Sequence, residues 1–172
     1  IVSDEPYEKL IYDGTTNFSL GSCEEFKDHV VTVNSFSKTY AMTGWRVGYA
    51  HGPEYIIKAM VKLQENLSSC VNSAAQQACI EAITGPQDAV YEMVEEYGKR
   101  RDVLVSGLNE LPGVSCIIPK GAFYAFSNIK KLGMTSSEVA KTIIRDVQVV
   151  ATPGSAFGSA GEGYLRLSFA SS

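Results

Sequence analysis

The sequence predicts an α/β chain organised in two parts. Short β-branched runs such as residues 29–36 are typical of buried strands, and apolar residues recur at three- and four-residue spacing over 90–111, as on the packed face of a helix. A Thr-Gly-Pro triplet at 84–86 separates these patterns and marks the best candidate boundary. We therefore expect residues 1–85 to complete a mostly parallel sheet with flanking helices, and residues 86–172 to form a smaller α+β domain.

The first part begins with strand-like runs and continues with two helices. The expected strands are residues 2–7, as the end of a buried strand, 29–36 and 47–50. An Ala- and Gln-rich helix is expected over 73–83. Before it, Pro53 suits the first turn of a helix that carries four apolar residues on one face, namely Ile56, Met60, Leu63 and Leu67.

A long amphipathic helix over 90–111 opens the second part, and Pro112 and Gly113 end it. After this helix, the spacing of the apolar residues changes more often, which indicates short strands mixed with helices. The elements expected there are strands at 114–119 and 122–127, a helix over 136–146 with Ser136 or Ser137 as N-cap, and strands around Val149 and at 164–170.

Composition limits the partners and the cell compartment. A net charge of -4 over 172 residues gives no basic field for nucleic acid, and no apolar run is long enough for a membrane span. The four cysteines lie far apart without a CxxC pair, so no metal site is indicated and structural thiols in a reducing, cytoplasmic protein are expected. The sequence starts within a β-prone run and without an initiator Met. We therefore expect it to be a piece of a longer chain.

Hydroxyls and cations lie close together at the end of the second predicted strand. Ser35, Ser37, Lys38 and Arg46 lie within twelve residues of one another. A single Lys is ordinarily a solvated turn residue, but a partly desolvated lysine amine forms a Schiff base with a carbonyl. Hydroxyl groups and a guanidinium hold a phosphate dianion. A phosphorylated aldehyde would suit both the lysine, through its carbonyl, and the hydroxyls and guanidinium, through its phosphate.

These residues carry a family resemblance. The segment "SFSKTYAMTGWRVG" resembles the cofactor-attachment signature of class I/II pyridoxal-phosphate aminotransferases, the aspartate aminotransferase-like enzymes of fold type I. Three further segments resemble the same family in the expected order: "SDEPYEKLIYDG", "PKGAFYAF", and "ATPGSAFG" followed by "YLRLSFA". The resemblance implies that residues 1–85 are the C-terminal portion of the large cofactor-binding domain, and that 86–172 are the small domain with the long interdomain helix.

The resemblance assigns a cofactor, pyridoxal 5'-phosphate, and the residues that bind it. Lys38 would form the Schiff base and later move a proton at the substrate α-carbon. Asp4 would pair with the pyridine nitrogen and keep it protonated, while Tyr7 would hydrogen-bond the phenolic oxygen of the ring. The residues that would hold the phosphate are Ser35, Ser37 and Arg46, with Trp45 packing to seat the arginine.

The resemblance also implies the reaction and the partners. Arg166 would bind the substrate α-carboxylate in a bidentate pair. The expected reaction is ping-pong transfer of an amino group from an L-amino acid to a 2-oxo acid, in an enzyme that is usually a homodimer. The phosphate loop of the family and most of its substrate-selecting residues would precede Ile1, so we expect this chain alone to be inactive. Pro6 departs from the family pattern by removing one backbone donor near Asp4.

Several alternatives remain open. On their own, Asp4 would be a turn or cap residue, Tyr7 a half-buried aromatic, and Arg166 an outward-facing strand residue. Ser35 and Lys38 form an SxxK pair, as in serine acyltransferases, but the SxN and KTG elements are absent. An aminotransferase-like sensing domain of a transcription regulator and a carbon–sulfur lyase would share the cofactor site. The segment "MTGWRVGYA" favours transamination among these.

Overall fold

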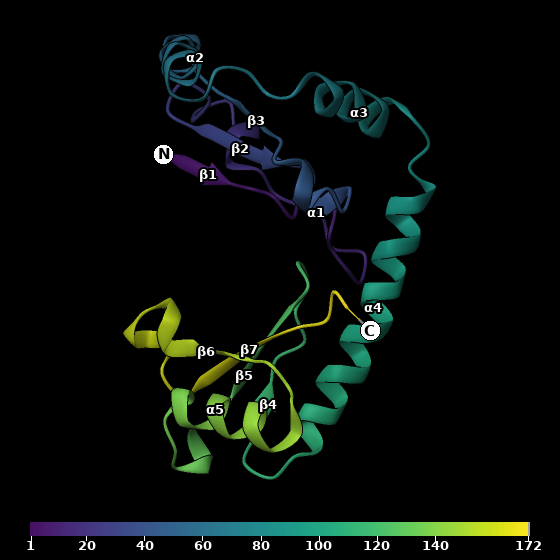
Figure 1. The fold of residues 1–172 in the computed structure, drawn as a ribbon, viewed down its shortest axis with the longest axis vertical. Coiled ribbons are helices and arrows are strands. Elements are labelled where there is room, and N and C mark those ends of the chain that lie inside the picture. The colour runs from purple at the N-terminus through teal and green to yellow at the C-terminus, as the bar shows by residue number, and fades with distance from the viewer. Residues whose placement is uncertain (172) are drawn as a thin grey trace. The chain divides into compact units, whose positions relative to one another are not determined.

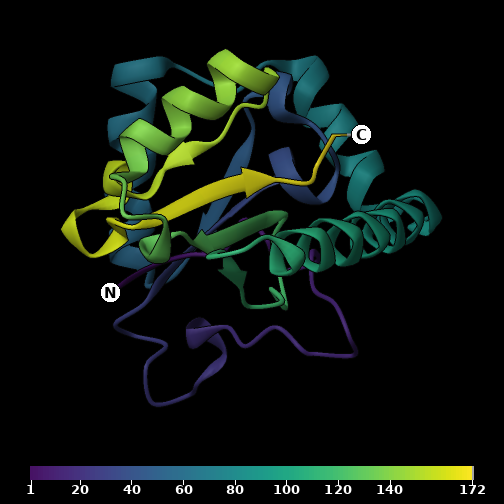
Figure 2. The same ribbon diagram turned by 90° about the horizontal axis from the view of Figure 1, so that it is seen from below.

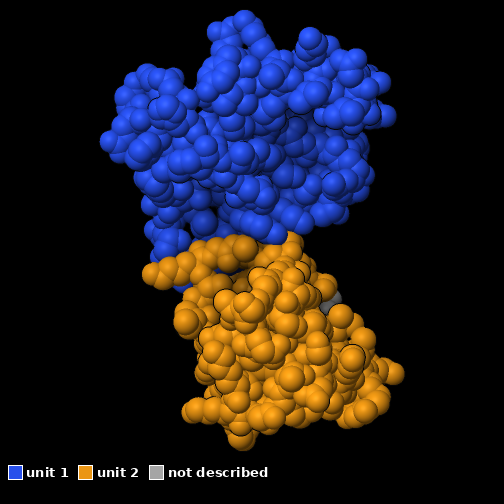
Figure 3. All heavy atoms as spheres, turned by 90° about the vertical axis from the view of Figure 1, so that its left-hand side faces the viewer, with its two compact units in different colours: residues 1–92 blue, residues 93–172 orange. Residues whose placement is uncertain are grey.

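The computed structural model describes residues 1–171, which form two compact units that divide between Glu92 and Met93 (Figure 3). The division falls inside the long helix α4 (Asp88–Glu110), whereas the sequence pattern suggested a boundary at 84–86. Within the described range, no helix combines the length and the apolar character that crossing a membrane requires. Short 3-10 turns connect several elements: η1 (Leu20–Ser22), η2 (Thr43–Trp45), η3 (Lys130–Leu132), η4 (Gly154–Phe157) and η5 (Ser159–Gly161).

A mixed three-stranded sheet organises the first unit (Figure 1). Its strands are β1 (Val2–Asp4), β2 (Val31–Ser35) and β3 (Gly48–His51), in the order β1-β2-β3. β1 runs parallel to β2, and β3 runs antiparallel to β2. The β-branched run predicted as a buried strand is β2, the central strand, which pairs on both sides.

β1 is shorter and more exposed than the buried strand expected over 2–7. Only Val2–Asp4 form the strand, and the Val2 side chain is 73% exposed. β1 pairs on one side only and the chain turns directly after it, with the Leu10 N–H donating to the Tyr7 carbonyl at 2.9 Å. The apolar residues that this segment buries come later, at Leu10 and Tyr12.

The two helices of the first unit differ in what they bury. α2 (Glu54–Ser68) has the predicted apolar face, yet none of its residues is buried, and Leu67 is 80% exposed. Of the four apolar residues on this face, only Ile56 is half-buried, so the described chain covers little of it. α3 (Ser73–Thr84) starts at the cap residue Asn72 and buries Ala75 and Cys79.

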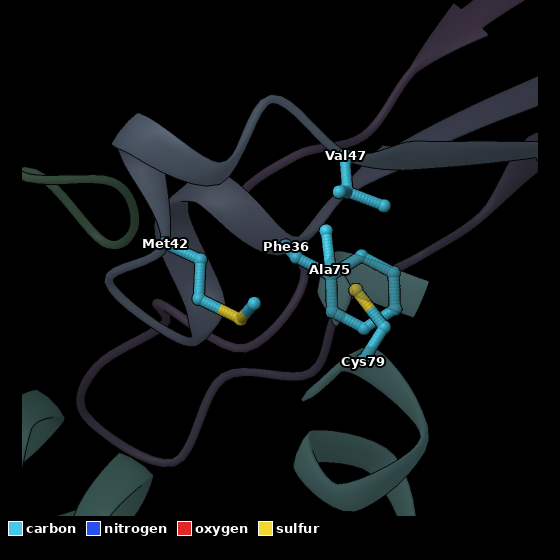
Figure 4. Close-up of a cluster of buried hydrophobic side chains, with 5 residues drawn as sticks. All are labelled: Phe36, Met42, Val47, Ala75 and Cys79. Carbon is cyan, nitrogen blue, oxygen red and sulfur yellow. The ribbon is translucent and has the colours of Figure 1, made fainter. Parts of the chain in front are cut away.

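α3 packs on the segment that follows β2. Ala75 and Cys79 form a core with three residues from 36–47, as Figure 4 shows: Phe36, Met42 and Val47. Burial raises the pKa of the Cys79 thiol, as an apolar environment disfavours the thiolate. This core anchors the chain on both sides of Lys38, which makes the lysine part of a packed turn.

The second unit is an antiparallel sheet with its helices on one face. The strands follow the order β4-β5-β7-β6, and α5 (Ser136–Val147) lies along one side of β5 and β7 (Figure 2). On this face, Leu165 of β7 packs against α5, and Ala125 of β5 packs against Val105 of α4. The strand bounds are β4 (Ser115–Cys116), β5 (Tyr124–Asn128), β6 (Thr152–Pro153) and β7 (Tyr164–Ser168).

Two strand expectations in this unit need correction. The strand expected over 114–119 has only two residues, and Ile117 beyond it is 89% exposed. The strand expected around Val149 lies instead at Thr152–Pro153. Both are short edge strands, whose extent depends on the partner strand rather than on their own apolar residues.

α5 begins at Ser136, as the sequence suggested, but its N-cap lies one residue earlier than expected. Thr135, not Ser136 or Ser137, is the N-cap, because it forms a capping box with Glu138. Ser136 is fully buried, and its N–H and hydroxyl donate to the Glu162 carboxylate at 2.7 and 2.9 Å. These hydrogen bonds lower the pKa of Glu162 below its ordinary value of 4.5.

We expect Glu162 to make α5 acid-sensitive. Because the folded state lowers the pKa of Glu162, its contribution is present above the unfolded value and is lost as the pH falls through the folded value, below 4.5. Glu162→Gln should therefore reduce amide protection of α5 at pH 7, and the difference from the wild type should vanish in acid. Hydrogen exchange measures this, with Glu110→Gln as the control. Equal protection of wild type and variant at pH 7 would contradict it.

Candidate functional site

The carboxyl ends of β1 and β2 define one edge of the first sheet (Figure 1). Asp4 is the last residue of β1, and Ser35 is the last residue of β2. The segment after β1 is tied to β2 by two hydrogen bonds, from the Glu5 N–H to the Val33 carbonyl at 2.8 Å and from the Asn34 amide to the Glu5 carbonyl at 3.0 Å. Ends of parallel strands are where α/β proteins place ligand-binding groups.

Ser35 fixes the turn that contains Lys38. It is the extended N-cap of α1 (Phe36–Thr39), and its hydroxyl accepts a hydrogen bond from the Ser37 N–H at 3.1 Å. Phe36 points into the core beside Cys79, while Ser37 is buried and Lys38 is half-buried. The small–apolar–small–Lys pattern has a local cause, since the serine caps the turn, the phenylalanine anchors it, and the lysine is left at the sheet edge.

Arg46 reaches the same edge from the other side. Its backbone is left-handed, with φ of 55°, and its Nη1 donates to the Thr43 carbonyl at 3.0 Å. Gly48, two residues on, pairs with Ser35 across the β2–β3 ladder. A side chain at Gly48 would not fit, because its Cβ would lie 2.7 Å from the Asn34 carbonyl oxygen.

Trp45 is 50% exposed, and its expected packing against Arg46 stays a prediction. The Thr43 carbonyl and the buried side chain of Val47 also hold this segment. The Arg46 guanidinium is exposed and makes no other hydrogen bond or ion pair within residues 1–171.

The first sheet therefore brings together five of the seven predicted site residues at one edge. They offer a carboxylate, two hydroxyls, an amine and a guanidinium, a set that fits a phosphorylated, nitrogen-containing carbonyl compound. Tyr7 lies in the turn that follows β1 and is half-buried. Within the described range, no cluster of His, Cys, Asp or Glu suits a metal ion. The five residues are Asp4, Ser35, Ser37, Lys38 and Arg46.

Arg166 belongs to the second unit. It is a half-buried residue of β7, on the face of the sheet opposite to Leu165 and the α5 core. Its guanidinium carbon lies 4.3 Å from the ring centre of Tyr124 and 4.4 Å from that of Phe157. The arginine that the sequence singled out is therefore held by aromatic rings.

Two features near the predicted residues were missed. The Thr39 hydroxyl donates to Glu8 Oε1 at 3.1 Å, which links the segment after β1 to α1, while Glu8 Oε2 is buried without a hydrogen-bond partner in the described chain. Burial, followed by the charge of Glu8, raises the pKa of Tyr40 and of Tyr49.

The other feature that the sequence analysis missed is the pair of aromatic rings beside Arg166. Strand alternation in "AFYAFS" gave a signal for Tyr124, but none existed for Phe157, which lies in a 3-10 turn.

A family model and the curated relatives that match this chain all point to the same family. A family model described as "Aminotransferase class I and II" matches residues 1–172. The chain is 44% identical over 172 residues to the aromatic-amino-acid aminotransferase 2 of Thermococcus litoralis, covering 99% of this chain and 44% of that protein. It is also 44% identical to an aspartate aminotransferase of Pyrococcus abyssi, with the same coverage.

A solved structure shares the fold. The aromatic aminotransferase of Pyrococcus horikoshii matches with a TM-score of 0.96 and 42% identity, covering 99% of this chain and 46% of that chain. The fold is thus that of the fold type I transferases expected from the sequence. The chain spans less than half the length of these relatives.

Proposed function

Because the chain belongs to the class I and II aminotransferase family, we propose that it is the C-terminal part of a pyridoxal-phosphate-dependent enzyme that transfers an amino group from an L-amino acid to a 2-oxo acid. The share of its relatives' length that it spans supports the view that it is a part. The observation that carries the proposal is the anchored turn at Lys38, with Asp4, Ser35 and Arg46 along the same sheet edge.

Lys38 is the proposed catalytic residue. Pyridoxal phosphate, when bound, supplies an electron sink for the negative charge that develops at the substrate α-carbon. The Lys38 amine would hold the cofactor through its aldehyde carbon and would move the proton at the substrate α-carbon. The short helix α1 suits this role, since its neighbours Ser37 and Thr39 are buried and keep the turn in place.

The other residues of the sheet edge bind and orient. Asp4 would accept a hydrogen bond from the protonated ring nitrogen, a role that suits a carboxylate because a neutral acceptor would let the proton leave. Ser35, Ser37 and Arg46 would hold the phosphate, and the exposed N–H groups of Arg46 suit that contact. Tyr7 donates to the phenolic oxygen of the ring. In the second unit, Arg166 binds the substrate α-carboxylate through two parallel N–H groups.

Assembly and activity of the whole protein belong to the same proposal. We expect the full-length protein to act as a cytoplasmic homodimer in two alternating half-reactions. We expect the present chain to be inactive by itself, since it spans 44% of the length of its relatives. The names of the relatives cover both aromatic and aspartate substrates, so the donor is left to experiment.

An amino-donor screen tests the proposed function. The full-length protein, supplied with pyridoxal phosphate and 2-oxoglutarate, should convert aspartate, alanine or an aromatic amino acid into the matching 2-oxo acid, with formation of glutamate. Double-reciprocal plots at several 2-oxoglutarate concentrations should be parallel, as ping-pong kinetics require. Conversion of none of these donors, or release of sulfide and pyruvate from cysteine without an acceptor, would contradict the proposal, the latter in favour of a carbon–sulfur lyase.

A further inference from the structure

Arg166 has no anionic partner in the described part of the chain, residues 1–171. Its side chain makes no hydrogen bond and no ion pair within residues 1–171. Its guanidinium carbon instead lies over two aromatic rings, those of Tyr124 and Phe157, at 4.3 and 4.4 Å from their centres. Ring faces attract the cation through the quadrupole and leave the N–H groups, which lie in the guanidinium plane, available to another acceptor.

The rings are themselves held by their neighbours. On the same face of the sheet, Phe126 is the cross-strand partner of Arg166. Its ring stacks on Tyr164 at 4.9 Å and meets Phe157 edge to face at 6.3 Å. The Tyr124 ring lies 4.7 Å from that of Phe123. Aromatic pairs of this geometry are favourable beyond the area that they bury, so the faces presented to Arg166 have defined positions.

The turn that carries Phe157 is fixed by close backbone contact. Phe157 ends η4, which begins at Gly154. Gly154 packs so tightly against Gly161 that an added Cβ would clash with the Gly161 carbonyl. The Ser155 hydroxyl is also hydrogen-bonded to the buried Ser136 hydroxyl, at 3.2 Å. Although Phe157 is half-exposed, its backbone therefore has little freedom.

From this geometry we propose that Tyr124 and Phe157 are positioning residues for the substrate carboxylate, acting through Arg166. The inference rests on the proposed function, in which Arg166 binds the α-carboxylate. A carboxylate side chain would orient the arginine equally well, but it would use the same N–H groups that the substrate needs. Two ring faces orient the guanidinium and leave those groups for the substrate.

Variants of the full-length holoenzyme test this aromatic clamp, by which we mean the positioning of Arg166 by the rings of Tyr124 and Phe157. Tyr124→Leu and Phe157→Leu remove the aromatic faces, and Tyr124→Phe and Phe157→Tyr keep them as matched controls. Each Leu variant should lower kcat/KM for the amino-acid donor about tenfold, mostly through KM, because a partly desolvated cation–π contact has this order of strength. The ring-retaining controls should stay within about twofold of wild type.

Two further measurements separate positioning from folding. The half-reaction of the corresponding amine, which lacks the α-carboxylate, should proceed at the wild-type rate in each Leu variant. The affinity for a non-reacting carboxylate, maleate, should fall in the Leu variants, but Arg166→Ala should abolish any further effect of Phe157→Leu. Calorimetric titration measures this affinity without turnover.

The outcomes distinguish the two proposals. Suppose that the wild type transaminates and the Leu variants bind maleate as tightly as the wild type does. The proposed positioning role of the two rings is then wrong, and the proposed aminotransferase function is retained. Equal losses for the amino acid and the amine would also overturn the clamp, because they indicate general structural damage. If the wild type has no aminotransferase activity, the proposed function fails, and maleate affinity still decides whether the rings position Arg166.

Discussion

The variant Lys38→Ala of the full-length enzyme is expected to lose activity by a factor of about 10⁴ or more, the upper range of what a positioned acid–base group contributes. The side chain would supply both the covalent attachment and the proton transfer, so no neighbour can replace it. Lys38→Arg should be equally inactive, because a guanidinium is not deprotonated in proteins. Single-turnover rates of the amino-donor half-reaction measure the loss.

The fold should survive this change. Lys38 is half-buried, whereas the core contacts of α1 are made by Phe36. Lys58 is the matched control, since it is exposed on α2 and pairs with Glu54 at 2.6 Å. Lys58→Ala should retain wild-type rates. A Lys38→Ala enzyme that keeps a tenth of the wild-type rate would show that another group carries the proton.

Replacing Arg166 with Leu is expected to lower kcat/KM for amino acids by about 10²- to 10³-fold, since losing one partner of a charged, hydrogen-bonded pair costs about 2–5 kcal/mol. The loss should lie mainly in the Michaelis constant if substrate and transition state use the arginine equally. Arg166→Lys should recover only part of it, because an ammonium group lacks the planar fork. Steady-state kinetics with the preferred donor measure both parameters.

Arg145→Leu is the matched control for Arg166. This arginine is exposed at the end of α5 and pairs with Asp146 at 2.6 Å, so its loss should leave kcat/KM unchanged. The hydrogen bond to Asp146 raises the pKa of Arg145, which stays charged throughout the assay range. Unchanged kinetics in Arg166→Leu would rule out this arginine as the carboxylate site.

Elements with a strong local pattern were predictable from the sequence. Apolar periodicity and caps located α3, α4 and α5 to within one or two residues at each end, and the β-branched run located β2. The failures were β1, β4 and the strand expected at Val149, where pairing with a distant strand sets the length. The face of α2 shows a further limit, since an apolar stripe predicts that a helix packs but does not identify its partner.

The same distinction holds for the site. Ser35, Ser37, Lys38 and Arg46 could be grouped from sequence because they lie in one segment that folds around one strand end. The Glu8–Thr39 hydrogen bond joins residues 31 positions apart, and no periodic signal marks it. The position of Phe157 beside Arg166 depends on the packing of Gly154 against Gly161, which only the folded chain shows.

The attachment point of the cofactor tests the central claim most directly. The full-length protein should be incubated with pyridoxal phosphate, reduced with borohydride and digested, and its peptides mapped by mass spectrometry. One lysine, Lys38, should be modified, and no lysine should be modified in Lys38→Ala. A label on a different lysine, or an intact protein that takes up no label, would contradict it.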